Sequence, residues 1–146
     1  MKKIIFSLLV VVAATTVFAQ KKKEKSAIEG KIYDVTTFEI KGGKSGKSLP
    51  DQISFKTQKV KSKVISEKID WAAVKYTVTS DSSHTESEGD AVREINFEAE
   101  GTNDKEETLK WTGTISNYSI DGTITLSKKG KTKKEFTFSG SEKAKK

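Results

Sequence analysis

The sequence predicts an all-β fold in which about eight antiparallel strands form an up-and-down meander that closes into a small barrel. Two patterns lead to this prediction. Apolar and polar residues alternate along most of the chain after residue 29, as in strands with one buried and one solvated face. Short turn-like segments separate these runs at nearly even spacing. The alternative is a two-sheet β-sandwich, which would bury the same faces with different connections.

The start of the chain has the pattern of a secretory signal peptide. Lys2 and Lys3 precede an apolar run from Ile4 to Val12, and small residues up to Ala19 form a cleavage site. We therefore expect residues 1–19 to be removed and the protein to act in the bacterial periplasm or outside the cell. The chain has no cysteine, so we expect neither disulfides nor a cysteine-linked lipid anchor. No later apolar run is long enough to predict a transmembrane segment.

Charge divides the rest of the chain into a neutral body and two basic ends. The whole chain has a formal net charge of +7, but the stretch from Ser26 to Ser141 carries as many acidic as basic residues. We expect a basic N-terminal tail over residues 20–29, a single barrel domain over 30–141, and a basic C-terminal tail over 142–146. A neutral body in an exported protein disfavours nucleic acid as a partner. Such tails are usually solvated, and docking to an anionic envelope component is the functional alternative.

Strand candidates in the N-terminal half alternate less regularly than those that follow. The segment from Gly42 to Lys47 predicts a flexible hairpin loop, because its glycines lack the spacing of a phosphate-binding loop. Ile69–Ala73 predicts one helical turn or a strand crossing, and Asp81–Asp90 predicts a polar loop. The strand candidates are Gly30–Lys41, Gln52–Thr57, Lys59–Glu67 and Val74–Ser80.

The C-terminal half alternates more clearly. In Glu94–Glu100, the residues Ile95, Phe97 and Ala99 point one way and polar residues point the other. The same pattern continues over Leu109–Ile115, Ile120–Leu126 and Phe136–Gly140, and glycines 113, 122 and 140 fall on the inward face. Glycine inside a strand predicts a bend, a bulge or a close approach of two backbones.

Short motifs spread over most of the chain after the signal carry a family resemblance. They are Gly30–Tyr33, Ile53–Phe55, Ile95–Ala99, Trp111–Gly113, Ile120–Thr123, Lys129–Lys131 and Phe136–Gly140. Together they resemble a family of small secreted bacterial proteins of unknown function with a lipocalin-like, calycin-type β-barrel. The resemblance implies a lipocalin-like barrel for this chain.

A weak candidate metal site lies in the predicted polar loop. Asp81, Glu86, Glu88 and Asp90 surround His84, the only histidine of the chain. Carboxylates are ligands that calcium prefers, but their order here does not match a calcium-binding loop. We therefore predict a solvated loop and expect no metal or cofactor.

No set of side chains predicts catalysis. Glu98 and Glu100 share one strand face, as paired carboxylates of a glycoside hydrolase might. They point outward, and Lys110 on the following strand is an expected neighbour, so a solvated charged face is the simpler interpretation. We expect a monomer that is not an enzyme.

Large aromatic residues are the candidates for a ligand-binding interior. The first hypothesis is that the exported barrel binds a small apolar or amphipathic molecule, although the same rings would also fill a small barrel. Trp71 lies outside the regular strands and could cap one mouth of the barrel. The predicted lining residues are Tyr33, Phe55, Trp71, Phe97, Trp111 and Phe136. The alternative is an interaction module whose outer face or lysine-rich tails bind an anionic envelope polymer or a protein.

Overall fold

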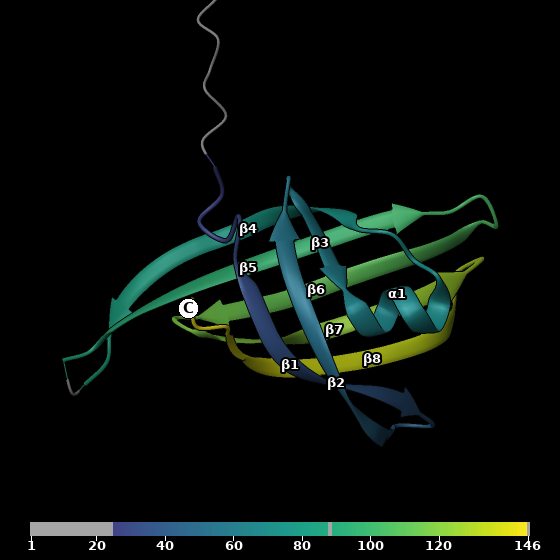
Figure 1. Cartoon of the computed structure of the whole chain (residues 1–146), viewed down its shortest axis with the longest axis horizontal. Helices are drawn as coiled ribbons and strands as arrows, with labels where there is room; N and C mark the ends of the chain where they lie inside the picture. Colours follow the sequence, from purple (N-terminus) through teal and green to yellow (C-terminus); the bar gives the residue numbers. More distant parts are fainter. Residues whose placement is uncertain (1–24, 88, 146) are drawn as a thin grey trace, which may run out of the picture.

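The computed structural model describes residues 25–87 and 89–145, which form a closed antiparallel barrel of eight strands (Figure 1). Each strand pairs with the next along the chain, and β1 also pairs with β8, which closes the ring. This order confirms the predicted up-and-down barrel rather than the sandwich. The elements are β1 (Ile32–Lys41), β2 (Lys44–Lys56), β3 (Lys59–Ser62), α1 (Lys63–Ile69), β4 (Val74–Thr85), β5 (Ala91–Thr102), β6 (Glu107–Ser116), β7 (Ser119–Lys128) and β8 (Lys131–Glu142).

The apolar face of each strand fills the barrel interior. On β5, Ile95, Phe97 and Ala99 are buried, while Glu98 and Glu100 are exposed. Burying a side chain of this kind stabilises a fold by about 1.5–3 kcal/mol, so these alternating positions supply most of the driving force for closure. The alternation predicted from the sequence is therefore the inside-outside pattern of the barrel.

Two inward glycines let aromatic rings pack against the sheet. Gly113 on β6 lies opposite Gly122 on β7. A Cβ atom on Gly113 would lie only 2.5 Å from ring atoms of Phe97, and one on Gly122 would lie 2.6 Å from the ring of Phe138. A Cβ atom on Gly122 would also meet the Thr112 carbonyl oxygen and the Gly113 Cα, which confirms the predicted close approach of two backbones there.

The predicted strand Lys59–Glu67 is wrong in its second half, where the chain turns into α1. Ser62 caps the helix, because its hydroxyl accepts a hydrogen bond from the Ile65 N–H at 3.0 Å. Val64 and Ile65 are both buried, which a helix permits and an alternating strand does not. The predicted turn or crossing at Ile69–Ala73 is the end of α1 followed by an irregular segment.

Two predicted loops are much shorter than expected. The glycine-rich loop is reduced to the turn Gly42-Gly43, because β2 already begins at Lys44. The polar loop from Asp81 is also shorter, because β4 continues to Thr85 and β5 begins at Ala91. In both hairpins backbone pairing extends through polar residues, which carry little hydrophobic signal for a strand.

The turns divide between two ends of the barrel, because consecutive strands run in opposite directions. We call one the α1 end; it carries α1 and the β1–β2, β5–β6 and β7–β8 turns. We call the other the terminal end; it carries the start of the described chain, the β2–β3, β4–β5 and β6–β7 turns and the end of β8. Figure 1 shows α1 and the β7–β8 turn at the right and the C-terminus at the left.

A turn over residues 26–30 closes part of the terminal end. Ile28 is fully buried and belongs to the core. The carboxylate of Glu29 accepts hydrogen bonds from the Gln58 N–H at 3.0 Å and from the Tyr76 hydroxyl at 2.9 Å. The folded body therefore begins before Gly30, inside the segment predicted as a tail.

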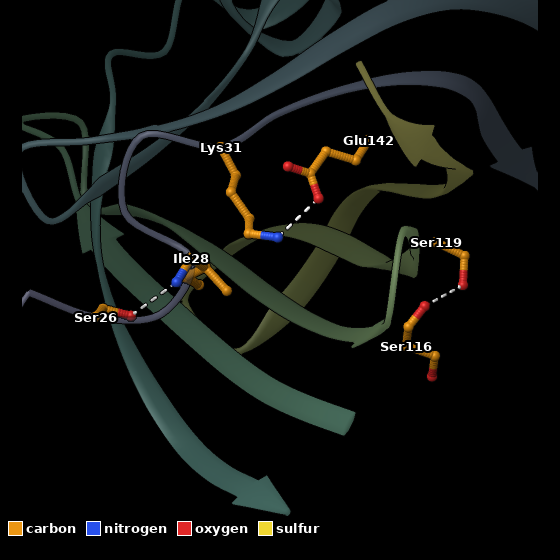
Figure 2. A network of polar contacts seen from close by, with 6 residues as sticks. All are labelled: Ser26, Ile28, Lys31, Ser116, Ser119 and Glu142. Atoms are coloured by element: carbon orange, nitrogen blue, oxygen red, sulfur yellow. Dashed lines mark hydrogen bonds and ion pairs between the residues drawn. The ribbon is translucent and has the colours of Figure 1, made fainter. Parts of the chain in front are cut away.

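The two chain ends are also joined to each other. Lys31 Nζ lies 2.7 Å from Glu142 Oε2 in a half-buried ion pair, which Figure 2 shows. Glu142 is still part of β8, so the C-terminal tail begins after it rather than at it.

Candidate functional site

Most of the predicted lining residues occupy the barrel interior, so a ligand could enter it only by displacing them. Five of the six are at most 1% exposed inside the barrel: Tyr33, Phe55, Phe97, Trp111 and Phe136. The Phe55 ring packs edge-on against Phe97, with 5.0 Å between ring centroids, and against Tyr33 at 6.0 Å. Trp71 is partly buried and packs against the core from the segment after α1. Phe55 therefore contacts both Tyr33 and Phe97, and the five buried rings occupy the barrel interior.

Two polar atoms are buried in this interior without a hydrogen-bond partner among the described residues. They are the Tyr33 hydroxyl and the Trp111 indole N–H. Burial, and after it the negative charge of Glu142, raises the pKa of Tyr33 above its usual value. Tyr33 therefore stays protonated at neutral pH and cannot act there as a base.

The acidic residues of the candidate metal loop are divided between a strand and a turn. Asp81 lies on β4, and its carboxylate accepts hydrogen bonds from Arg93 Nε at 2.9 Å and Nη2 at 2.6 Å. These hydrogen bonds hold the pKa of Asp81 below its usual value. Glu86 and Asp90 lie in the β4–β5 turn, and Glu88 lies outside the described residues. Within the described ranges, no three His, Cys, Asp or Glu side chains could together hold a metal ion.

The other acidic candidates are on the outer face. Glu98 and Glu100 are exposed on β5, and Glu100 lies directly opposite Lys110 on β6, as predicted. His84 is exposed on β4 opposite Val92. None of these side chains points into the interior.

Pairs of lysines close three tight turns of the barrel. The central residues of these turns, Gly42-Gly43, Thr57-Gln58 and Lys129-Gly130, all have positive φ, as in type I′ hairpins. The flanking strand residues lie directly opposite each other and are Lys41 with Lys44, Lys56 with Lys59, and Lys128 with Lys131. Like charges in register across a hairpin are destabilising. Lys128 also lies opposite Glu107 of β6, so an acidic neighbour offsets part of this repulsion in the β7–β8 hairpin.

Two of these lysine-closed hairpins are neighbours at the α1 end, because β8 pairs with β1. Ile40 of β1 lies opposite Glu135 of β8, and from there both strands run to their turns. Lys41 forms one ion pair, with Glu39 at 3.5 Å, and its side chain is 75% exposed. We define the lysine cluster as the exposed or half-exposed lysines of these two hairpins: Lys41, Lys44, Lys47, Lys128, Lys129, Lys131, Lys133 and Lys134.

The lysine cluster is suited to an extended anionic chain. A lysine ammonium is a hydrated point charge on a flexible stem, and it donates to anionic oxygens without the fixed geometry of arginine. Spread over two hairpins, such groups match a ligand whose charges repeat along its length. A compact anion would touch only one or two of them.

Sequence reasoning predicted turns at these places but missed the pairing of the lysines, although a signal was present. The tetrads Lys41-Gly-Gly-Lys44, Lys56-Thr-Gln-Lys59 and Lys128-Lys-Gly-Lys131 share the spacing Lys-x-x-Lys. That spacing places two lysines opposite each other only if the middle residues form a two-residue turn. Net charge summed over long segments hid the repeat.

No protein-family model, curated protein or solved structure matched the chain. The resemblance to a lipocalin-like secreted family therefore stays a prediction. Of the helices within residues 25–87 and 89–145, none has the length and apolar character to cross a lipid bilayer.

Proposed function

We propose that this chain is an exported, non-enzymatic module that binds an anionic polymer of the bacterial envelope through the lysine cluster. The observation that carries the proposal is the in-register pairing of lysines at the neighbouring β1–β2 and β7–β8 turns. In each pair the two lysines lie directly opposite each other, and this like-charge pairing costs the hairpin some stability. An anionic chain lying across the α1 end would neutralise both pairs at once.

The packing of the interior supports a surface function over a ligand inside the barrel. Phe55 and Phe97 contact each other where a buried ligand would lie. A ligand entering the barrel would have to separate such rings, and each loses favourable burial when it moves. The outer surface requires no such rearrangement.

The test measures binding to a labelled anionic polymer, dextran sulfate, with neutral dextran as the matched control. A variant with Lys41→Gln, Lys44→Gln, Lys128→Gln and Lys131→Gln removes both pairs. We expect its affinity to fall by about tenfold or more at low salt, with a salt dependence smaller by roughly one counterion per lysine removed. Its stability to urea should not fall, because like-charge repulsion is removed.

A second variant removes the same charge elsewhere. Lys56→Gln, Lys59→Gln, Lys61→Gln and Lys75→Gln alter lysines on β2, β3 and β4 outside the cluster. We expect this variant to lose much less affinity than the cluster variant. Equal losses would show that net charge alone drives binding and would overturn the proposal.

The tails are tested by deleting residues 20–25 and 143–146, which keeps Glu142 and its ion pair with Lys31. Binding should persist without the tails. If instead the tail deletion abolishes binding and the cluster variant retains it, the tails are the site and the proposal fails.

A further inference from the structure

The terminal end of the barrel carries an apolar patch that the proposed function does not use. Tyr118, in the β6–β7 turn, is 75% exposed, and Ile32, at the start of β1, is 40% exposed. Among the described residues these are the exposed large hydrophobic side chains. Most exposed apolar residues of a soluble domain are scattered singly, so their relative position matters.

Tyr118 and Ile32 lie on either side of the end of β8. The Glu142 N–H donates to the Tyr118 carbonyl at 2.6 Å, and the next N–H, that of Lys143, donates to the Ile32 carbonyl at 2.8 Å. One dipeptide therefore holds both backbones. Because the two residues flank the same dipeptide, we treat their side chains together as the patch.

A hollow of about 330 Å³ extends the patch beside Tyr118. Ile95 and Ile115 contribute its floor, and Ala27 and Ala91 contribute its sides. Figure 2 shows the surroundings: Ser116 and Ser119, which flank the turn of Tyr118, lie on one side of the Lys31–Glu142 pair, and Ser26 and Ile28 lie on the other. The hollow, which Ala27 and Tyr118 both line, thus connects the turn with the N-terminal segment.

The turn that presents Tyr118 is held in place. The Arg93 N–H donates to Asn117 Oδ1 at 2.9 Å, and the Asn117 N–H donates to the Arg93 carbonyl at 3.0 Å. This double contact fixes the β6–β7 turn on β5. Tyr118 is therefore presented on a supported turn.

Two cations line the hollow, and both are ion-paired. Lys31 pairs with Glu142 at 2.7 Å and Arg93 pairs with Asp81 at 2.6 Å, while neither carboxylate lines the hollow itself. Lys143 is exposed directly after the end of β8, next to the patch. The described chain also begins and ends at this end of the barrel, and Lys25 and Lys145 near its two ends are exposed.

We propose that the terminal end docks on the surface of an anionic lipid bilayer, with Tyr118 and Ile32 in the headgroup region and the basic residues around them facing anionic lipids. Tyrosine favours the bilayer interface because one end of its ring is apolar and the other polar. Each lysine near an anionic surface adds about 1 kcal/mol of attraction. Neither the apolar insertion nor the charge attraction alone gives stable binding, whereas the two together do. This docking goes beyond the proposed function, since it uses the end of the barrel opposite the lysine cluster.

The test is co-sedimentation of the exported protein with vesicles of phosphatidylglycerol and phosphatidylcholine, compared with vesicles of phosphatidylcholine alone. We expect binding to the anionic vesicles and little to the neutral ones. Tyr118→Ser should weaken binding by about fivefold, and Tyr118→Ser with Ile32→Ser by more. Both positions are exposed, so urea unfolding should confirm that the variants stay folded. Unchanged binding of the double variant would overturn the proposal.

A spectroscopic measurement checks the insertion directly. Tyr118→Trp adds an indole to the patch, and its fluorescence should shift to the blue and be quenched by brominated lipids in anionic vesicles. The parent protein, with Trp71 and Trp111 in or against the core, gives the background signal. If the added indole shows neither change while the protein sediments with vesicles, charge alone holds it and the apolar docking is wrong.

Testing each variant in the binding assay of the other proposal distinguishes the two proposals. The lysine-cluster variant should still bind anionic vesicles, and the Tyr118→Ser variant should still bind dextran sulfate. Loss of vesicle binding in the lysine-cluster variant alone would place lipid binding at the α1 end and overturn docking by the terminal end. A stoichiometric complex of Tyr118 with a protein, without affinity for vesicles, would likewise replace the bilayer as its partner.

Discussion

The carboxylate of Asp51 accepts a hydrogen bond from the Ser62 hydroxyl at 2.6 Å inside the barrel wall. Asp51 is a buried carboxylate, 7% exposed, on β2. It also accepts hydrogen bonds from the Thr37 hydroxyl at 2.8 Å and the Val64 N–H at 3.0 Å. One side chain therefore joins β1, β2 and the start of α1.

Removing this acceptor should destabilise the barrel. In Asp51→Ala the hydroxyls of Thr37 and Ser62 and the Val64 N–H lose their acceptor, and buried donors without a partner cost about 1–3 kcal/mol each. We expect the free energy of unfolding in urea to fall by at least about 2 kcal/mol. Asp34→Ala is the control, because Asp34 is exposed and bonds only the Gln52 side chain at 2.9 Å. A loss in the control as large as in Asp51→Ala would contradict the role of the buried contacts.

The fold of the C-terminal strands could be predicted from sequence, whereas the region around Asp51 could not. Val60, Ser62 and Val64 alternate as a strand would, and the local pattern favours continuing it. The chain instead bends at Ser62, because Ser62 caps α1 and Asp51, distant in sequence, binds the Val64 N–H. Such a contact depends on the pairing of β2 with β3, which no local window contains.

The candidate site, too, could be predicted from the sequence only in part. The lysines are visible in the sequence, but their pairing requires tight turns, and one of these has Thr57 and Gln58 at positive φ without any glycine. Those residue types do not signal a type I′ turn. The five aromatic residues on strands are buried as alternation predicts, whereas Trp71, outside the strands, is only partly buried. Whether they line a cavity or fill it depends on packing that a sequence does not display.

Gly113 should be difficult to replace. A methyl group there would overlap the Phe97 ring, at 2.5 Å from two ring atoms, and overpacking of a closed core costs about 1–3 kcal/mol. We expect Gly113→Ala to lower the urea midpoint and Thr112→Ala, on the outer face beside it, to change it much less. Phe97→Leu in the Gly113→Ala background should recover part of the loss, because the smaller side chain relieves the overlap. Simple additivity of the two losses would contradict a direct contact.

Glu29 should make the terminal end sensitive to acid. The hydrogen bond from the Gln58 N–H is the main cause that holds the pKa of Glu29 below its usual value, and Tyr76, Thr57 and Lys25 act in the same direction. A carboxyl whose pKa is lowered by folding stabilises the fold above its unfolded pKa of 4.5, and this contribution is lost as the pH falls below that value.

The variant Glu29→Gln should therefore be less stable than the parent near neutral pH and should converge with it in acid. Urea unfolding at a series of pH values measures this difference. Glu86→Gln, in the β4–β5 turn, is the control and should follow the parent throughout. A constant difference between Glu29→Gln and the parent at all pH values would mean that the contacts of Glu29 do not depend on its charge.

Tyr33 should limit stability in alkali. Its pKa is raised by burial and by Glu142, so the folded state keeps the phenolic proton above pH 10.0, where the unfolded chain begins to lose it. The stability that this proton contributes is present below pH 10.0 and is lost as the pH rises above it.

Tyr33→Phe removes the titrating group and should flatten the alkaline fall in the free energy of unfolding. Because the Tyr33 hydroxyl has no partner among the described residues, the same change should leave stability at neutral pH unaltered or raise it by about 1 kcal/mol. Tyr118→Phe, at an exposed position, should change neither property. A Tyr33→Phe protein that is clearly less stable at neutral pH would show that the hydroxyl does form a hydrogen bond, and the packed interior would then have to include its acceptor.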